Sequence, residues 1–159
     1  MRRITALALG AAMLALAGAA PGLADETVSF HAQVSQTSLV SQSCEAGVCD
    51  LEFEGSGAAN IMGPFTFTNH IVQDFTVTPC NPITGEHTLV GATGSITIAD
   101  AGTICRNSAS PSGFPFTISS TWEITGGTGE FSGITGSGTS QGTIGGNGPV
   151  VHFTGSVSF

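Results

Sequence analysis

The chain has 159 residues, of which 11 are acidic and only 3 are basic, so its formal net charge at pH 7 is −8 with neutral histidine. Two of the three basic residues, Arg2 and Arg3, lie in a segment that we expect to be removed, which leaves Arg106 and a formal charge of −10. Binding to nucleic acid or to an anionic membrane surface requires clustered Lys or Arg. The composition therefore excludes both partners, and the remaining length suits one domain.

The first 24 residues have the pattern of a secretory signal peptide. The two arginines precede an apolar run rich in Ala and Leu, and small residues precede a cleavage site after Ala24. A membrane anchor would need about 20 apolar residues followed by a stop-transfer flank, whereas a polar sequence follows here. We therefore expect one secreted or periplasmic domain over residues 25–159; the alternative for the first segment is an ordinary helix.

Apolar and polar residues alternate along most of the mature chain, which predicts half-buried β-strands. The clearest case is residues 114–125, where the even-numbered positions share one face and the odd-numbered ones are mostly Thr and Ser. The apolar faces of the other predicted strands are Val28, Phe30, Ala32 and Val34; Leu51 and Phe53; Phe65, Phe67, Ile71, Phe75 and Val77; Val90, Ala92, Ile96 and Ile98; and Val151, Phe153, Val157 and Phe159.

Clusters of turn-forming residues separate these runs. They occupy residues 54–64, 79–86, 99–102, 107–113 and 145–149. About eight strands joined by short connections favour an all-β fold, an antiparallel up-and-down β-barrel rather than a sandwich.

The chain contains four cysteines, at Cys44, Cys49, Cys80 and Cys105. In an exported protein they predict two disulfides, for which three pairings are possible. The short loop between Cys44 and Cys49 can close on itself at a hairpin end, which favours Cys44–Cys49 and Cys80–Cys105. A zinc site that combines cysteines with His31 or His87 is the alternative, but the usual close ligand spacings are absent from the sequence. We predict no metal and no other cofactor.

Glycine is unusually dense for a strand pattern between residues 121 and 146. Gly126–Gly129 predicts a tight hairpin turn. The inward-facing positions are odd-numbered at Phe131 but even-numbered from Ile134 onward. This change of parity predicts a bulge or kink near Gly133.

The glycines beyond that point leave one strand face almost bare. In a small closed barrel this makes room for large side chains on neighbouring strands, here Trp122, Phe116 and Phe153. The alternative is a platform that a ligand approaches closely. Asn69 and Gln73 interrupt an apolar strand face, and such amides either bond to neighbouring groups or orient a ligand. Asn69, Gln73 and Trp122 are therefore the candidate ligand-binding residues.

The sequence contains no residue set that is typical of catalysis. Residues 138–142 match the pattern G-x-S-x-G, but that motif needs later acid and histidine partners, and only His152 follows. We predict no catalytic residue.

Three segments resemble exported bacterial β-barrel proteins that are similar to the allene oxide cyclase and dirigent barrels. They read "GSGAANIMGPFTFT", "WEITGGTGEFSGITGSG" and "FTGSVSF", and the likeness extends over residues 55–159. The resemblance implies a calycin-like barrel of eight strands with a central cavity, which in the plant relatives receives a small apolar or aromatic molecule. No active-site residue of those enzymes matches a position in this chain, so the resemblance does not imply their catalytic activity.

Three functions are compatible with such a barrel. The first is a non-catalytic binding or structural module for a small apolar ligand or an extracellular partner, which the lack of a catalytic set favours. The second is a lyase or isomerase similar to allene oxide cyclase, whose cavity folds a reactive substrate. The third is a small outer-membrane barrel, as the terminal alternation up to Phe159 allows. One Trp and no Tyr is too few for the aromatic girdles of a membrane barrel.

Overall fold

The computed structural model describes residues 26–106, 116–145 and 148–159, without the side chains of residues 36 and 37. The predicted signal peptide, its cleavage site, Phe114 and the predicted turn at residues 107–113 lie outside the described residues. The strands are β1 (Thr27–Glu45), β2 (Val48–Ala59), β3 (Gly63–Asp74), β4 (Cys80–Val90), β5 (Ser95–Arg106), β6 (Phe116–Gly127), β7 (Thr135–Gly145) and β8 (Gly148–Ser158).

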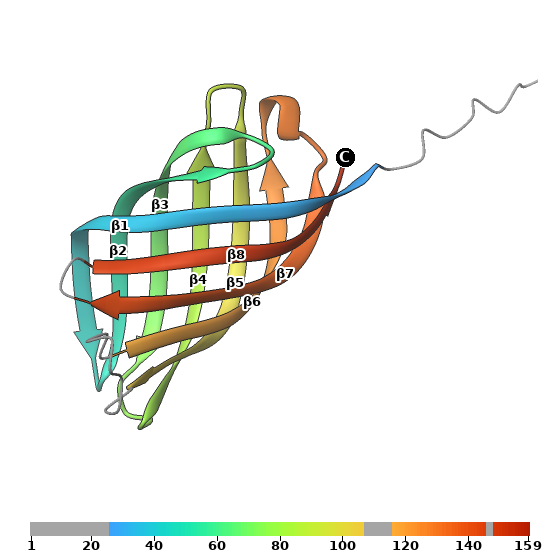
Figure 1. Cartoon of the computed structure of the whole chain (residues 1–159). Coiled ribbons are helices and arrows are strands. Elements are labelled where there is room, and N and C mark those ends of the chain that lie inside the picture. Colours follow the sequence, from blue (N-terminus) through green and yellow to red (C-terminus); the bar gives the residue numbers. More distant parts are fainter. Residues whose placement is uncertain (1–25, 107–115, 146–147) are drawn as a thin grey trace, which may run out of the picture.

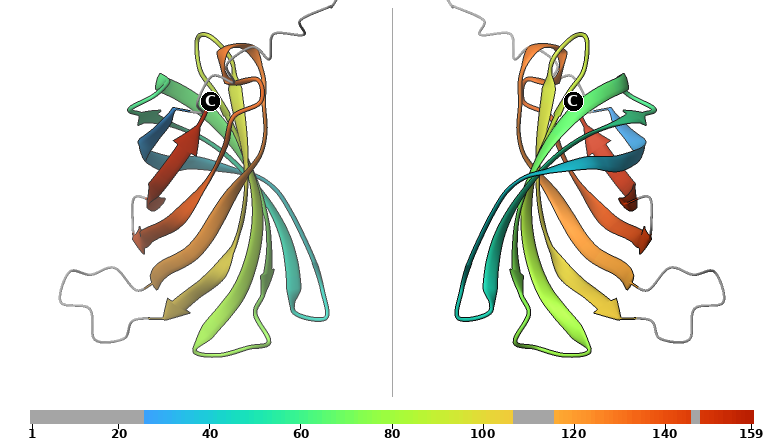
Figure 2. Two further views of the ribbon diagram at one scale, coloured as in Figure 1. Left: turned by 90° about the vertical axis from the view of Figure 1, so that its right-hand side faces the viewer. Right: turned by 90° about the vertical axis from the view of Figure 1, so that its left-hand side faces the viewer.

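The eight strands form a closed barrel in which each strand pairs antiparallel with the next, as Figure 1 shows. The predicted up-and-down β-barrel is thus confirmed. Pairing between β1 and β8 closes the barrel but extends only from Thr27 to Ser35. Two register shifts follow in β1, and its second half then pairs with β2 alone. Figure 2 shows this half of β1 turned away from β8 together with β2.

One half of the barrel is filled by the hydrophobic core. This half carries both ends of the described chain and the connections β2–β3, β4–β5 and β6–β7 (Figure 1). Its buried side chains form one cluster, which consists of Phe30, Ala32, Val34, Ala59, Phe65, Phe67, Leu89, Ile96, Ile98, Trp122, Phe131, Ile134, Val151, Phe153 and Val157. We call this region the packed half. No helix long and apolar enough to cross a membrane occurs among the residues that the structure describes.

Trp122 is the largest side chain of the packed half and is 3% exposed. Its ring lies edge-on to Phe30 and Phe153, with ring centres 5.3 and 6.4 Å away. A β-carbon added to Gly138 or to Gly155 would come within 2.7 Å of Cζ2 of this indole. The glycines of β7 and β8 therefore leave room for the tryptophan, as the sequence predicts.

The connection between β6 and β7 differs from the predicted tight turn. Gly126 and Gly127 end strand β6, and the chain then forms a 3-10 turn, η1 (Gly129–Phe131). The change of parity falls in this connection, before β7 begins, so Gly133 lies in a loop with φ of +83° rather than at a strand bulge. The longer connection allows Phe131 to bury its ring in the packed half.

Three predicted turn segments lie largely within strands. Residues 99–102 belong to β5, residues 80–86 of the predicted turn 79–86 belong to β4, and of the predicted turn 54–64 residues 54–59 belong to β2 and residues 63–64 to β3. Their glycines and other small residues occupy places where large side chains of neighbouring strands need space, as Gly55 does beside the ring of Phe67. Strand pairing therefore outweighs local turn propensity here.

Five residues of the predicted apolar faces are exposed: Phe75, Val77, Val90, Ala92 and Phe159. Strand β3 ends at Asp74, whose carboxylate accepts hydrogen bonds from the backbone N–H and the hydroxyl of Thr76, at 2.8 and 2.6 Å. These bonds form a local turn that stops the strand, so the alternation before Asp74 does not continue beyond it.

Candidate functional site

The other half of the barrel encloses a cavity of about 140 Å³. Its wall is mainly apolar and includes Leu51, Phe53, Ile71, Ile83, Ile104 and Ile118, and it borders the packed half at Val34, Val151 and Phe153. The polar residues that line it are Asn69, Gln73, His87 and Asp100. We call this region the hollow half. Its volume is close to that of apolar protein cavities of about 150 Å³ that accept a benzene-sized molecule.

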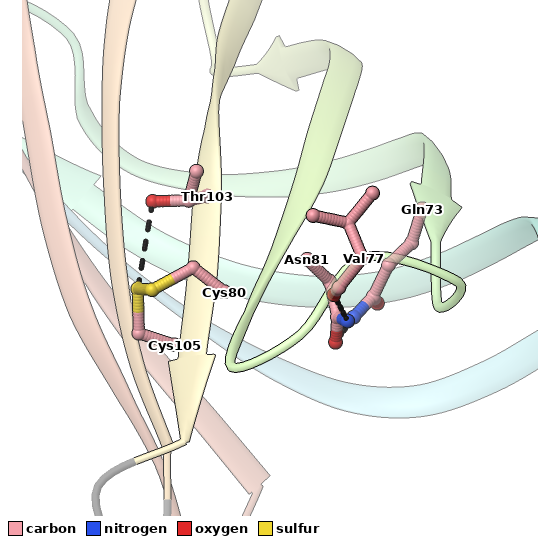
Figure 3. Close-up of a disulfide and its surroundings, with 6 residues drawn as sticks. All are labelled: Gln73, Val77, Cys80, Asn81, Thr103 and Cys105. Carbon is pink, nitrogen blue, oxygen red and sulfur yellow. Dashed lines mark hydrogen bonds between the residues drawn. A yellow bond between two sulfur atoms is a disulfide. The ribbon is translucent and has the colours of Figure 1, made fainter.

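Both disulfides lie at the hollow half. Cys44–Cys49 closes the β1–β2 hairpin, and Cys80–Cys105 joins directly paired positions of β4 and β5. Figure 3 shows the second disulfide beside Thr103 of β5. These are the two pairings that the sequence favours, and they leave none of the four cysteines free as a zinc ligand. Two disulfides point to a non-reducing environment outside the cytoplasm.

Replacing both Cys80 and Cys105 by serine is expected to lower the free energy of unfolding by about 3 kcal/mol, because this bridge closes the longer loop. The same change at Cys44 and Cys49, which are only 5 residues apart, is expected to cost about 2 kcal/mol. Urea denaturation followed by circular dichroism measures both values. A larger loss for the short loop would contradict the loop-entropy explanation.

A belt of buried polar side chains crosses five neighbouring strands at the cavity. One residue comes from each of β3 to β7, and together we call them the polar belt: Asn69, His87, Asp100, Ser120 and Ser140. The strand register pairs Asn69 with His87 and Ser120 with Ser140. Three of the five, Asn69, His87 and Asp100, line the cavity.

Asp100 is the centre of the polar belt. Its Oδ1 lies 3.1 Å from Nε2 of His87, but the two atoms are not aligned for a hydrogen bond. Its Oδ2 accepts a hydrogen bond of 2.7 Å from the hydroxyl of Ser120, which also contacts the hydroxyl of Ser140. A β-carbon on Gly85 would come within 2.5 Å of Oδ1, so that glycine makes room for the carboxylate.

These contacts determine the charge state of Asp100. Burial alone would raise the pKa of its carboxyl, but His87 and the Ser120 hydroxyl together outweigh burial. The pKa of Asp100 is therefore held below its usual value. Ser120 donates to the carboxylate and not to the imidazole, so the serine is not activated as it would be in a Ser-His-Asp nucleophile.

The three candidate ligand-binding residues lie in two different places. Asn69 and Gln73 line the cavity, whereas Trp122 lies in the packed half, where its indole N–H donates to the carbonyl oxygen of Thr139 at 2.9 Å. The structure thus brings together the two amides but not the indole. This packing contact accounts for the position of Trp122 without a ligand.

The amide of Gln73 has a structural partner. Its Nε2 donates to Oδ1 of Asn81 at 3.1 Å, and Nδ2 of Asn81 donates to the carbonyl oxygen of Val77 at 2.6 Å. Figure 3 shows these residues together where β3 leads into β4. The three groups brace that connection. The side-chain oxygen of Asn69, in contrast, has no hydrogen-bond partner among the described residues.

Sequence reasoning missed His87 and Asp100 as site residues. Asp100 falls in a segment with the composition of a turn, and His87 directly follows another. A usable signal was present in the alternation: His87 shares its parity with Leu89, and Asp100 shares its parity with Ile98. Side chains at these positions of β4 and β5 point into the barrel.

No protein-family model matches the chain, and no curated protein is significantly similar to it in sequence. The basis for a function is therefore the geometry of the cavity and its polar residues. Within the described residues, no group of three or more His, Cys, Asp or Glu side chains is arranged to hold a metal ion.

Proposed function

We propose that this protein is a non-catalytic binding module that holds one small apolar molecule in the hollow half of its barrel. The observation that carries the proposal is the cavity of about 140 Å³ with a mainly apolar wall. Ligand sites are typically apolar pockets that contain a few polar groups for orientation. The packed half and the two disulfides support such a site, because they hold the strands of the cavity wall in fixed positions.

A lyase or isomerase similar to allene oxide cyclase is the second candidate. The observation in its favour is that His87 and Asp100, which can transfer protons, line the cavity. The binding function ranks first because the two groups are engaged with each other, and the serine of the polar belt donates to the carboxylate. Catalysed cyclisation of an unsaturated epoxide, lost on replacing His87, would reverse this order.

A secreted or periplasmic location outside the bilayer belongs to the same proposal. The outward positions of β6 and β7 carry Thr, Ser, Glu and Gln, whereas the apolar side chains of these strands face the interior. A barrel in the outer membrane carries an apolar band on its outer face. The polar outer face and the two disulfides support the binding module over the outer-membrane alternative.

Cyclohexane is expected to raise the melting temperature of the protein, because a ligand that binds only the folded state stabilises it. At a free concentration ten times the dissociation constant, the gain is about 1.4 kcal/mol. Differential scanning calorimetry measures the shift.

The variant Ile71→Trp fills the cavity and should abolish the response. Val72→Trp is its matched control, since Val72 is the next residue of β3 and lies on the opposite face. If cyclohexane has no effect on the wild type, or the same effect on both variants, the proposed binding function is wrong.

A further inference from the structure

The side-chain oxygen of Asn69 is a buried hydrogen-bond acceptor without a partner. Asn69 is 1% exposed and lines the cavity, and its Oδ1 makes no hydrogen bond within the described residues. Buried polar groups in proteins almost always have a partner, because an unpaired one costs free energy. The other amide in the cavity, that of Gln73, is satisfied by Asn81. Oδ1 of Asp100 also makes no hydrogen bond but lies 3.1 Å from Nε2 of His87, so Oδ1 of Asn69 is the acceptor left for a donor on a ligand.

The neighbouring strand β4 carries a second polar residue of the cavity wall, His87. His87 pairs directly with Asn69 in the β3–β4 register, and side chains at such positions have β-carbons about 4.5–5.5 Å apart. We assign a proton to Nε2 of His87, because the carboxylate of Asp100 lies 3.1 Å from it. That N–H is not aligned on Asp100 and is buried. Nε2 of His87 nevertheless lies beside Asp100 on β5, which leaves Oδ1 of Asn69 as the acceptor for a ligand.

The ionisable groups at the cavity already contact each other. His87 and Asp100 are the only ionisable residues among those described as lining it, and Nε2 of His87 lies 3.1 Å from Oδ1 of Asp100. An anionic or cationic ligand would bring a further charge into an otherwise apolar cavity, where an unpaired charge is very unfavourable. The ligand that fits is neutral.

We infer that the hollow half binds a small neutral alcohol, of the size of one six-membered ring, whose hydroxyl donates to Oδ1 of Asn69. The inference rests on the proposed binding function and adds the chemical class of the ligand. The size follows from the cavity volume of about 140 Å³. The hydroxyl follows from the unpartnered Oδ1 of Asn69, since Oδ1 of Asp100, which also lacks a hydrogen-bond partner, lies beside Nε2 of His87.

The test is calorimetric titration of the protein with cyclohexanol, cyclohexane and cyclohexanecarboxylate. These probes share a ring and differ only in the polar group. In the wild type we expect cyclohexanol to bind and cyclohexanecarboxylate to bind at least ten times more weakly than cyclohexanol. Equal or tighter binding of the carboxylate would contradict a neutral ligand.

The decisive variant is Asn69→Leu, which keeps a similar volume and removes the acceptor. We expect the ratio of the cyclohexanol to the cyclohexane dissociation constant to rise at least tenfold over the wild type. Thr68→Leu, on the outward face of the same strand, should leave the ratio unchanged. Retained cyclohexane binding by Asn69→Leu shows that its cavity is intact, and an unchanged ratio would overturn the inference.

A readout on the wild type covers the case in which Asn69→Leu does not fold. The NMR signals of the Asn69 side-chain amide should shift when cyclohexanol is added and shift much less with cyclohexane. Equal shifts would overturn the inference. If neither cyclohexane nor cyclohexanol binds the wild type, the proposed binding function fails; if both bind without involving Asn69, only the alcohol assignment fails.

Discussion

Replacement of Trp122 by alanine is expected to lower the free energy of unfolding by about 3–5 kcal/mol. The indole is buried between Phe30 and Phe153 and donates a hydrogen bond to a backbone carbonyl. Two glycines, Gly138 and Gly155, lie against it, and glycine has no side chain that could move into the space left behind. The cavity created by the substitution therefore stays largely open.

Urea denaturation of Trp122→Ala and Trp122→Phe measures this effect. The phenylalanine variant refills much of the space and should lose clearly less stability than the alanine variant. A loss below about 1 kcal/mol for Trp122→Ala, the size typical of surface changes, would contradict the central packing role of this residue.

The substitution Asp100→Asn is expected to lower the free energy of unfolding at neutral pH by about 2–3 kcal/mol, because it removes the buried carboxylate that accepts a hydrogen bond from Ser120 and lies 3.1 Å from Nε2 of His87. The matched control is Asp50→Asn. Asp50 lies 2.7 Å from His70 in the same kind of Asp–His pair, but both side chains are 54% exposed. Exposed pairs contribute less than about 1 kcal/mol. Equal losses in the two variants would contradict a stabilising role of burial for the Asp100 pair.

The same carboxylate sets the expected response to acid. Because the pKa of Asp100 is lower in the folded protein, the unfolded chain takes up the proton first as the pH falls. The stabilisation is therefore complete above the usual aspartate pKa of about 3.9 and is lost as the pH falls through the lower, folded value. Equilibrium denaturation between pH 2 and pH 6 should show a shallower acid decline for Asp100→Asn. A decline as steep as that of the wild type would contradict the lowered pKa.

The barrel could be predicted from the sequence because strand alternation is a local pattern. Phe30, Ala32 and Val34 alternate with polar residues, and all three are buried in the core. Asn69 could be singled out for the same reason, since an amide in an apolar row is visible within one strand. The local pattern gave a wrong prediction where a turn interrupts a strand. Strand β3 ends at Asp74, so Phe75 does not continue its apolar face.

The polar belt could not be predicted in this way. Its members are separated by 13 to 20 residues along the chain, and only the register of five neighbouring strands brings them together, with Asp100 two positions from direct pairing with His87 and with Ser120. The segment around Asp100 has the composition of a turn, and only pairing with β4 and β6 makes it a strand interior. The cavity likewise depends on which inward side chains meet across the barrel, which no single strand reveals.

The central claim is that one half of the barrel is packed and the other half is hollow and apolar. A crystal structure under xenon pressure tests it most directly, because xenon occupies apolar cavities of this size. We predict one xenon site among Ile71, Ile83 and Ile104, and none beside Trp122 in the packed half. A barrel without a xenon site between these isoleucines, or with its only site beside Trp122, would contradict the claim.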